Sequence, residues 1–154
     1  MKNTRSHLIL NQIDKKLSSF ESLKTTVIPT KGWTHTIRTA LKMSLRQLGD
    51  KMQFSAQHIK QMEEREANGT ITLNSLQEVA RALDMQLVYG FVSKHASLEQ
   101  MIEKRAKELA TEIVMRTNNT MALEDQQNSK ERIAQAIAQK TAEIKDEMPK
   151  YLWD

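Results

Sequence analysis

The sequence predicts a mainly α-helical fold with one short β-strand near residues 86–92. Helix breakers are rare, since the 154 residues include only two prolines and four glycines. Apolar side chains recur every three or four residues over most of the chain, which is the spacing of amphipathic helices. The period changes only at residues 87–92, where Leu-Val-Tyr-Gly-Phe-Val is rich in β-branched and aromatic residues.

The first part of the chain, residues 1–30, is predicted to be a helical arm. Residues 5–24 place five apolar side chains on one helical face. These side chains are Ile9, Ile13, Leu17, Phe20 and Leu23. The dipeptide Ile28-Pro29 and the following Gly32 mark a linker that ends the arm.

Residues 33–93 are predicted to form a helical domain that begins with a core helix at residues 33–42. Ser44 and Ser55 each stand directly before an apolar helical series, which is the position of a helix N-cap. The apolar side chains of these three helices are Trp33, Ile37, Leu41, Leu45, Leu48, Met52, Ile59 and Met62. The helices that open at the two serines are joined by a tight turn at Gln53-Phe54. They therefore make a helix-turn-helix, whose second helix can enter the DNA major groove.

A polar loop, a fourth helix and the strand are predicted to complete this domain. Residues 63–70 read as an exit loop closed by an Asn-Gly pair. Ser75 with Glu78 fits the reciprocal capping box of a helix at residues 74–83. The strand near 86–92 cannot satisfy its own backbone groups, so it must pair, and a symmetric partner chain is the first expectation.

Residues 97–154 are predicted to form a C-terminal helical region. Ser97 opens one helix, which the polar stretch 117–120 ends, and a last helix covers residues 131–148. The tail, residues 149–154, contains two of the few aromatic side chains of the protein. An apolar tail of this kind docks on its own fold or on a partner.

The charge distribution favours a polyanionic partner for the first part of the chain. Residues 1–62 contain eleven Lys and Arg against three acidic residues, a local balance of +8. Residues 94–154 contain ten basic and eleven acidic residues and are nearly neutral. A strongly basic surface attracts nucleic acid.

Composition argues against several classes of protein. Without cysteine there is no disulfide or thiolate chemistry, and the four isolated histidines predict no metal site and no cofactor. The run Leu8-Ile9-Leu10 is too short for a signal-peptide core, and nothing approaches a membrane span, so we expect a cytoplasmic protein. The sequence has no evident nucleophile–base pair or Gly-rich phosphate loop, so we expect no catalytic residue and no enzyme.

The candidate DNA-binding residues lie at the start of the two helices of the helix-turn-helix. Gln can bond adenine bidentately, and Lys can bond guanine or phosphate. Side chains at a helix N-terminus commonly meet phosphate. The candidates are Arg46, Gln47, Ser55, Ala56, Gln57, His58, Lys60 and Gln61, with Lys42 and Lys51 as electrostatic contributors. The alternative is an ordinary solvated helix face, and for His58 the two interpretations are evenly balanced.

The spacing of apolar residues over about 50 residues resembles the Xre/lambda-repressor-like helix-turn-helix family. The pattern runs through Ile37-x-x-Ala40-Leu41-x-Met43-Ser44, Leu48-x-x-x-Met52, Phe54-Ser55-x-x-x-Ile59, Met62-Glu63 and Leu73-x-x-Leu76-x-x-Val79-Ala80-x-Ala82-Leu83. The chain departs from the family at Leu45 and Ala56, where glutamine is usual, and at Gly49, where alanine is usual. Base recognition is therefore expected to differ from that of other members.

Further segments, spread over nearly the whole chain, resemble the mobile mystery protein A family. They are Gly32-Trp33, Gly69-Thr70-Ile71-Thr72-Leu73, Ala82-Leu83-Asp84-x-x-Leu87-Val88-Tyr89, Met121-Ala122-Leu123-Glu124-x-Gln126 and Leu152-Trp153-Asp154. Members of that family are encoded beside mobile mystery protein B, which carries a Fic domain. Fic domains usually transfer AMP from ATP to a hydroxyl group of a target protein. The resemblance implies a Fic-domain partner and repression of the shared operon.

Thr120 and Glu124 are candidate toxin-inhibitory residues. Many Fic proteins are silenced by a helix bearing Ser/Thr-x-x-x-Glu followed by Gly or Asn, whose glutamate obstructs the ATP γ-phosphate. Here the element after Glu124 is Asp125, so the match is incomplete. The alternative, which we favour, is a structural helix start capped by Thr120.

Together these features predict an antitoxin-like transcriptional repressor of a bacterial cytoplasm, associated with the nucleoid when it binds a two-fold operator. Residues 33–93 would bind double-stranded DNA as a homodimer, and residues 97–154 would contact the second protomer or the Fic toxin. The alternative is a protein-only binding module whose helix-turn-helix has lost DNA affinity. The aromatic rings of Trp33, Tyr89 and Trp153 are expected to pack in a core or interface rather than to stack on bases.

Overall fold

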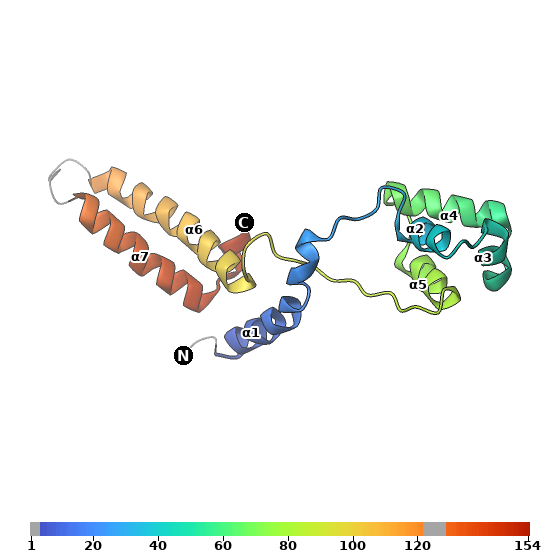
Figure 1. The fold of residues 1–154 in the computed structure, drawn as a ribbon. Helices are drawn as coiled ribbons and strands as arrows, with labels where there is room; N and C mark the ends of the chain where they lie inside the picture. Colours follow the sequence, from blue (N-terminus) through green and yellow to red (C-terminus); the bar gives the residue numbers. More distant parts are fainter. Residues whose placement is uncertain (1–3, 122–128) are drawn as a thin grey trace. The chain divides into compact units, whose positions relative to one another are not determined.

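The computed structural model describes residues 4–121 and 129–154, and the fold is mainly α-helical (Figure 1). The elements are α1 (Thr4–Ser18), the 3-10 helix η1 (Glu21–Thr25), α2 (Trp33–Ala40), α3 (Leu45–Met52), α4 (Ala56–Asn68), α5 (Leu73–Ala82), α6 (Leu98–Met121), α7 (Ser129–Glu147) and the 3-10 helix η2 (Lys150–Trp153). No helix in the described ranges combines the length and the apolar character needed to cross a membrane.

The chain divides into two compact units. The terminal unit combines Met1–Glu21 with Phe91–Asp154, and the central unit is Ser22–Gly90. The sequence suggested a separate N-terminal arm, but α1 packs on α6 and so belongs with the C-terminal helices.

The terminal unit is built on the antiparallel pair α6 and α7, which lie side by side (Figure 1). Its buried side chains are Ile102, Ala106, Ala110, Ile144 and Leu152. Two alanines on one face of α6 allow α7 to approach closely, because small side chains keep little distance between helix axes. The helix α1 joins α6 through Asp14, whose Oδ1 accepts the backbone N–H of Leu98 at 2.8 Å and so caps α6.

The C-terminal tail docks on its own unit, one of the two possibilities left open by the sequence. Leu152 is only 1% exposed, and Arg105 donates from Nε to the Leu152 carbonyl at 2.6 Å. A second bond joins the Arg105 guanidinium to the Asp154 carbonyl at 2.7 Å. The ring of Trp153 stays 59% exposed, so it does not pack in this core.

The central unit buries Leu48, Ile59, Met62 and Val79, contributed by α3, α4 and α5. The predicted caps at Ser44 and Ser55 are confirmed, since each hydroxyl accepts a backbone N–H three residues later. Trp33 and Leu41, expected in the core, are instead 45% and 58% exposed. The buried positions of α2 are Thr34 and Arg38, because α2 contacts α4 through polar groups.

Three predicted helix boundaries are wrong, each for a local reason. The first helix ends at Ser18, where the Ser18 and Ser19 hydroxyls donate to the carbonyls of the last turn. The last helix of the central unit opens at Thr72, whose Oγ1 accepts the Ser75 N–H, so Ser75 is not the cap. The stretch 117–120 lies inside α6, so it does not end that helix and Thr120 does not start one.

The predicted polar loop at residues 63–70 is also wrong. Residues 63–68 form the second half of α4, which ends only at Gly69 in a left-handed conformation with φ 81°. Glu63 and Glu66 make buried or half-buried contacts with α2, so this half of the helix has a structural partner.

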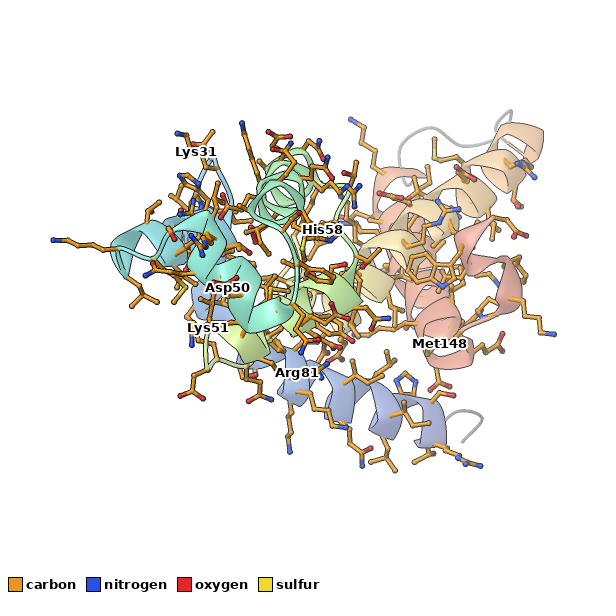
Figure 2. The ribbon with its side chains drawn as sticks, turned by 90° about the vertical axis from the view of Figure 1, so that its right-hand side faces the viewer. Lys31, Asp50, Lys51, His58, Arg81 and Met148 are labelled. Atoms are coloured by element: carbon orange, nitrogen blue, oxygen red, sulfur yellow. The ribbon has the colours of Figure 1, made fainter. Side chains whose placement is uncertain are left out.

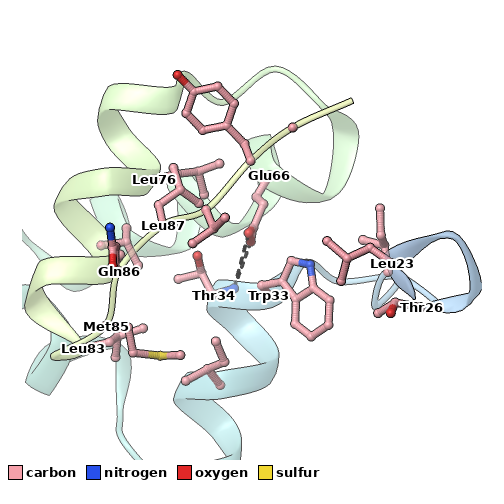
Figure 3. A pocket seen from close by; sticks show the side chains of 17 residues that line it. Leu23, Thr26, Trp33, Thr34, Glu66, Leu76, Leu83, Met85, Gln86 and Leu87 are labelled. Carbon is pink, nitrogen blue, oxygen red and sulfur yellow. Dashed lines mark hydrogen bonds between the residues drawn. The ribbon is translucent and has the colours of Figure 1, made fainter. Parts of the chain in front are cut away.

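The predicted strand near 86–92 is not present in the described part of the chain. Among the described residues, no backbone–backbone hydrogen bond joins residues 86–92 to another segment. Residues 85–90 instead line an apolar hollow of about 570 Å³ together with side chains of α2 and α5 (Figure 3).

We predict that Leu152→Ala will lower the free energy of unfolding by about 2–5 kcal/mol, because it leaves a cavity where the tail is buried. Trp153→Ala is the matched control, since the neighbouring side chain is mostly exposed, and it should cost less than about 1 kcal/mol. Urea denaturation of the full chain, followed by circular dichroism, measures both values. Equal midpoints for the two variants would contradict the docking of the tail.

Candidate nucleic-acid interface

The turn between α3 and α4 is fixed by backbone geometry. Gln53 ends α3 in a left-handed conformation with φ 60°, and the Phe54 N–H donates to the Gly49 carbonyl at 2.8 Å. A Cβ added at Gly49 would overlap the Phe54 carbonyl oxygen. Glycine is therefore required where the chain crosses so closely, which explains the departure from alanine seen in the sequence.

Two of the predicted site residues hold the start of α4. The Ser55 hydroxyl accepts the His58 N–H at 3.1 Å. The half-buried His58 ring packs against the Phe54 ring, with centroids 4.2 Å apart. These contacts give both side chains a role in the turn.

The first two turns of α4 present a polar face. Ile59 and Met62 are buried, whereas Gln57, Lys60 and Gln61 are exposed. The three exposed residues are spaced i, i+3 and i+4, so they lie on the same side of the helix. The structure therefore brings these three candidates together on one exposed surface, which we call the α4 face.

The predicted site residues of α3 and its flanks are exposed, but they differ in whether the side chain already makes a capping hydrogen bond. Gln47 completes a capping box, since its Oε1 accepts the Ser44 N–H at 2.8 Å. Arg46 is exposed in the first turn of α3, and Lys51 is exposed in its last turn (Figure 2). Lys42 follows α2 in a left-handed conformation with φ 55°.

Leu45 and Ala56, where the related family usually has glutamine, are both half-buried. Leu45 packs against the core of the central unit. The side chain of Leu45 therefore has a structural contact that a glutamine would not make as well. Ala56 is too small to reach a base edge by hydrogen bonding.

A buried ion pair lies behind the α4 face. Arg38 on α2 donates from Nε to Glu63 Oε1 at 2.5 Å and from the guanidinium to Glu63 Oε2 at 3.2 Å. Arg38 and Glu63 are only 8% and 7% exposed. His35 Nδ1 lies 3.0 Å from Glu63 Oε2. Arg38 also donates to the Met43 carbonyl at 2.8 Å, so α2, the start of α3 and α4 meet at one group.

A second acidic residue of α4 holds the N-terminus of α2. Glu66 Oε2 accepts the Thr34 N–H at 3.0 Å, as the dashed line in Figure 3 shows. A carboxylate at this end of a helix interacts favourably with the helix dipole. Gly32, just before α2, has φ 86° and lies so close to Glu66 that a Cβ would overlap the carboxylate.

This acidic set was not predicted from the sequence, because α4 was expected to end before residue 63 and instead runs to Asn68. Glu63, Glu64 and Glu66 fall in the stretch that was predicted to be a polar exit loop. Residues Ile59, Met62, Glu63 and Glu66 follow the i, i+3, i+4, i+7 spacing of a buried helical stripe. That spacing would have placed two of the three glutamates on the inner face of a longer helix.

Burial alone would raise the pKa of the Glu63 carboxyl, but the hydrogen bonds and charges of Arg38 and His35 outweigh it. The pKa of Glu63 is therefore held below its ordinary value. The carboxylate is charged at neutral pH and balances Arg38.

The basic residues of 1–62 are divided between the two units. Arg5, Lys15 and Lys16 belong to the terminal unit, and Arg38 is paired with Glu63. Apart from Lys24 and Arg38, the exposed basic residues of that stretch on the central unit are Lys31, Lys42, Arg46, Lys51 and Lys60. Attraction of a polyanion to the central unit would therefore come from these five side chains.

The structure describes only one member of the candidate inhibitory pair. Glu124 lies outside the described residues, and Thr120 lies within α6. Among the residues that the structure describes, no cluster of three or more His, Asp or Glu side chains could hold a metal ion. Comparisons with protein-family models, with curated proteins and with solved structures find no match to this chain.

We predict that Glu63→Gln will lower the free energy of unfolding of the central unit by about 3–5 kcal/mol at pH 7, because it leaves the Arg38 charge buried without its partner. Glu64→Gln, at the exposed neighbouring position, is the control and should change it by less than about 0.5 kcal/mol. Urea denaturation followed by Trp33 fluorescence in a Trp153→Phe background reports on the central unit.

Comparing the Glu63→Gln variant with the original protein also gives a prediction for the pH dependence of stability. Since the pKa of Glu63 is lowered in the folded state, its contribution is complete above the ordinary glutamate pKa of about 4.3 and is lost as pH falls through the lower folded value. The stability difference between the Glu63→Gln variant and the original protein should therefore shrink below about pH 4. A difference that stays constant down to pH 2 would contradict the charged pair.

Proposed function

We propose that this protein binds double-stranded DNA with α4 as the recognition helix of a lambda-repressor-like helix-turn-helix domain, and that it represses its own operon. The observation that carries the proposal is the α4 face. Gln57, Lys60 and Gln61 stand exposed directly after a tight turn from a capped helix, where side chains of a recognition helix reach base edges.

The chemistry of these side chains suits readout in the major groove. A glutamine amide can both accept from and donate to adenine, and a lysine ammonium can donate to guanine or phosphate. Arg46 in the first turn of α3 is placed for a phosphate contact, with Lys42 and Lys51 adding positive charge. Base readout would be confined to the first half of α4, because Glu64 follows on the same side and would repel phosphates.

The operator would be two-fold symmetric and read by a homodimer. Each protomer would place one α4 in the major groove. Half-sites about one helical turn apart, roughly 34–36 Å, match that arrangement.

We propose further that the partner is a Fic-domain protein, which this chain restrains as an antitoxin. Support comes from the resemblance of Gly32-Trp33, Gly69–Leu73 and Leu152–Asp154 to mobile mystery protein A. The alternative is a protein-only module. It is favoured by Leu45 and Ala56, because neither offers the hydrogen bonds that glutamine would supply.

We predict that the double variant Gln57→Ala/Lys60→Ala will bind DNA from its own promoter about 100-fold more weakly, because each lost contact with a base or phosphate costs about 1–3 kcal/mol. The control is Gln135→Ala/Lys107→Ala, which removes the same two residue types from exposed positions of the terminal unit. Fluorescence anisotropy with labelled promoter DNA measures both. Unchanged affinity in the α4 variant would refute the recognition-helix assignment.

The Fic partnership predicts a stable complex. If the reading frame beside this one encodes a Fic motif, the two tagged products should co-elute in size-exclusion chromatography at micromolar concentration. The expected complex should also lower AMP transfer by the Fic enzyme. Two separate peaks, with AMP transfer unaffected, would exclude this part of the proposal and leave DNA binding standing.

A further inference from the structure

The extended segment after α5 leaves its backbone exposed. The last hydrogen bond of the α5 turn joins the Met85 N–H to the Ala80 carbonyl at 2.7 Å. Within the described part of the chain, no backbone–backbone hydrogen bond reaches residues 86–92. Val88, Tyr89 and Phe91 are 65%, 62% and 84% exposed. These residues therefore combine a free strand edge with large apolar side chains.

Side chains of the segment hold it against the central unit. Met85 and Leu87 lie over the apolar hollow formed with α2 and α5 (Figure 3). Leu87 is half-buried, while Gln86 and Val88 on either side of it are exposed. From Met85 to Phe91 only Leu87 is half-buried, and the other residues are exposed.

The segment lacks the features that keep a strand edge from pairing. Natural edges carry charged residues, prolines or bulges. From Met85 to Ser93 there are nine consecutive residues without charge or proline. The first charged residues on either side are Asp84 and Lys94, one acidic and one basic.

We propose that residues 85–93 pair antiparallel with the same residues of a second copy of this chain, in a register centred on Tyr89. Asp84 and Lys94 lie five residues before and after Tyr89. In this register Asp84 of each copy, in the turn that ends α5, comes next to Lys94 of the other just beyond the paired residues, and the two-fold axis repeats the pair at both ends. This charge complementarity selects a copy of the same chain as the occupant.

The apolar positions agree with the same register. Leu87 of one copy faces Phe91 of the other, and the two Tyr89 rings form a cross-strand aromatic pair. Val88 of one copy faces Gly90 of the other, so the branched Val88 side chain has room because glycine has no side chain. Centring the pairing on Val88 would oppose Asp84 to Val92, and centring it on Gly90 would oppose Lys94 to Gln86, so the charges pair only around Tyr89.

This interface deepens the proposed homodimer, but it does not depend on any DNA contact. It would join the two DNA-binding units through the segment that directly follows α5. Dimerisation and DNA binding can therefore fail separately, and each has its own measurement.

Cysteine cross-linking tests the register, since the chain has no cysteine of its own. Tyr89→Cys should give a disulfide-linked dimer under mild oxidation, because facing residues of an antiparallel pair have Cα atoms about 4.5–5.5 Å apart. Phe91→Cys is the matched control. Its two copies would lie about 13 Å apart along the strands, beyond disulfide reach. A mixture of Leu87→Cys and Phe91→Cys chains should cross-link only as the mixed dimer.

The fraction of cross-linked dimer is measured for each variant on a non-reducing gel. Selective cross-linking by Tyr89→Cys and by the mixed pair supports the register. Val27→Cys, at a position 85% exposed, measures random collision. Cross-linking of Tyr89→Cys no faster than Val27→Cys, or slower than Phe91→Cys, would overturn the proposal.

Charge exchange tests the same interface at equilibrium. Lys94→Asp should weaken the dimer about tenfold in sedimentation equilibrium, because two attractions become two repulsions. Adding Asp84→Lys should restore it, and Asp84→Asn alone should weaken it less, while suiting the left-handed φ of 55° at that position. An unchanged dimer in Lys94→Asp with intact promoter binding would refute the register alone. A normal dimer that does not bind the promoter would refute the proposed function alone.

Discussion

The buried contact between Arg38 and Glu63 is the constraint on which the central unit depends. Two charges removed from water cost several kcal/mol each unless their partners are well placed. Here the guanidinium makes two bonds to one carboxylate and a third to the Met43 carbonyl, just before the cap of α3. The short helix α2 therefore fits on α4 in one arrangement, which also sets where α3 begins.

That arrangement divides α4 into two halves with different tasks. Glu63 and Glu66 in the second half face α2 and bind it, so they are unavailable to a ligand. Gln57 and Lys60 in the first half stay exposed beyond the turn, where Ser55 and the His58–Phe54 contact hold the helix start. Base readout requires a helix whose start is held rigidly and whose polar side chains are exposed, since a mobile recognition helix would lose more conformational entropy on binding.

Local sequence signals predicted the parts of this fold that local physics determines. Ser44 and Ser55 were identifiable as caps because a hydroxyl before an apolar series has few other uses, and the tight turn followed from them. The inner role of Glu63 was not predictable by composition, since an acidic run is usually solvated, and only the contact with Arg38, 25 residues earlier in the chain, gives it a partner. Likewise Trp33 was expected in the core because it is large and apolar, whereas the buried residues of α2 are Thr34 and Arg38.

The sequence predicted which residues belong to the candidate site, but not which of their side chains are exposed together on one surface. Arg46, Gln57, Lys60 and Gln61 are exposed as expected, whereas Gln47, Ser55 and His58 are also engaged in capping or packing. The strand was misjudged for a different reason: its pattern is that of a strand, but pairing needs a second edge that this chain does not supply in its described part. The sequence pattern indicates which residues favour a strand, but it does not indicate which second strand would accept their hydrogen bonds.

The most direct test of the account is the affinity of the full chain for its own promoter, compared with unrelated DNA of equal length, over a range of salt concentrations. A promoter-specific repressor should prefer the promoter by about 1,000-fold or more, with log affinity falling linearly and steeply as log salt rises. Equal and salt-independent affinities for the two DNAs, or no binding to either, would contradict it.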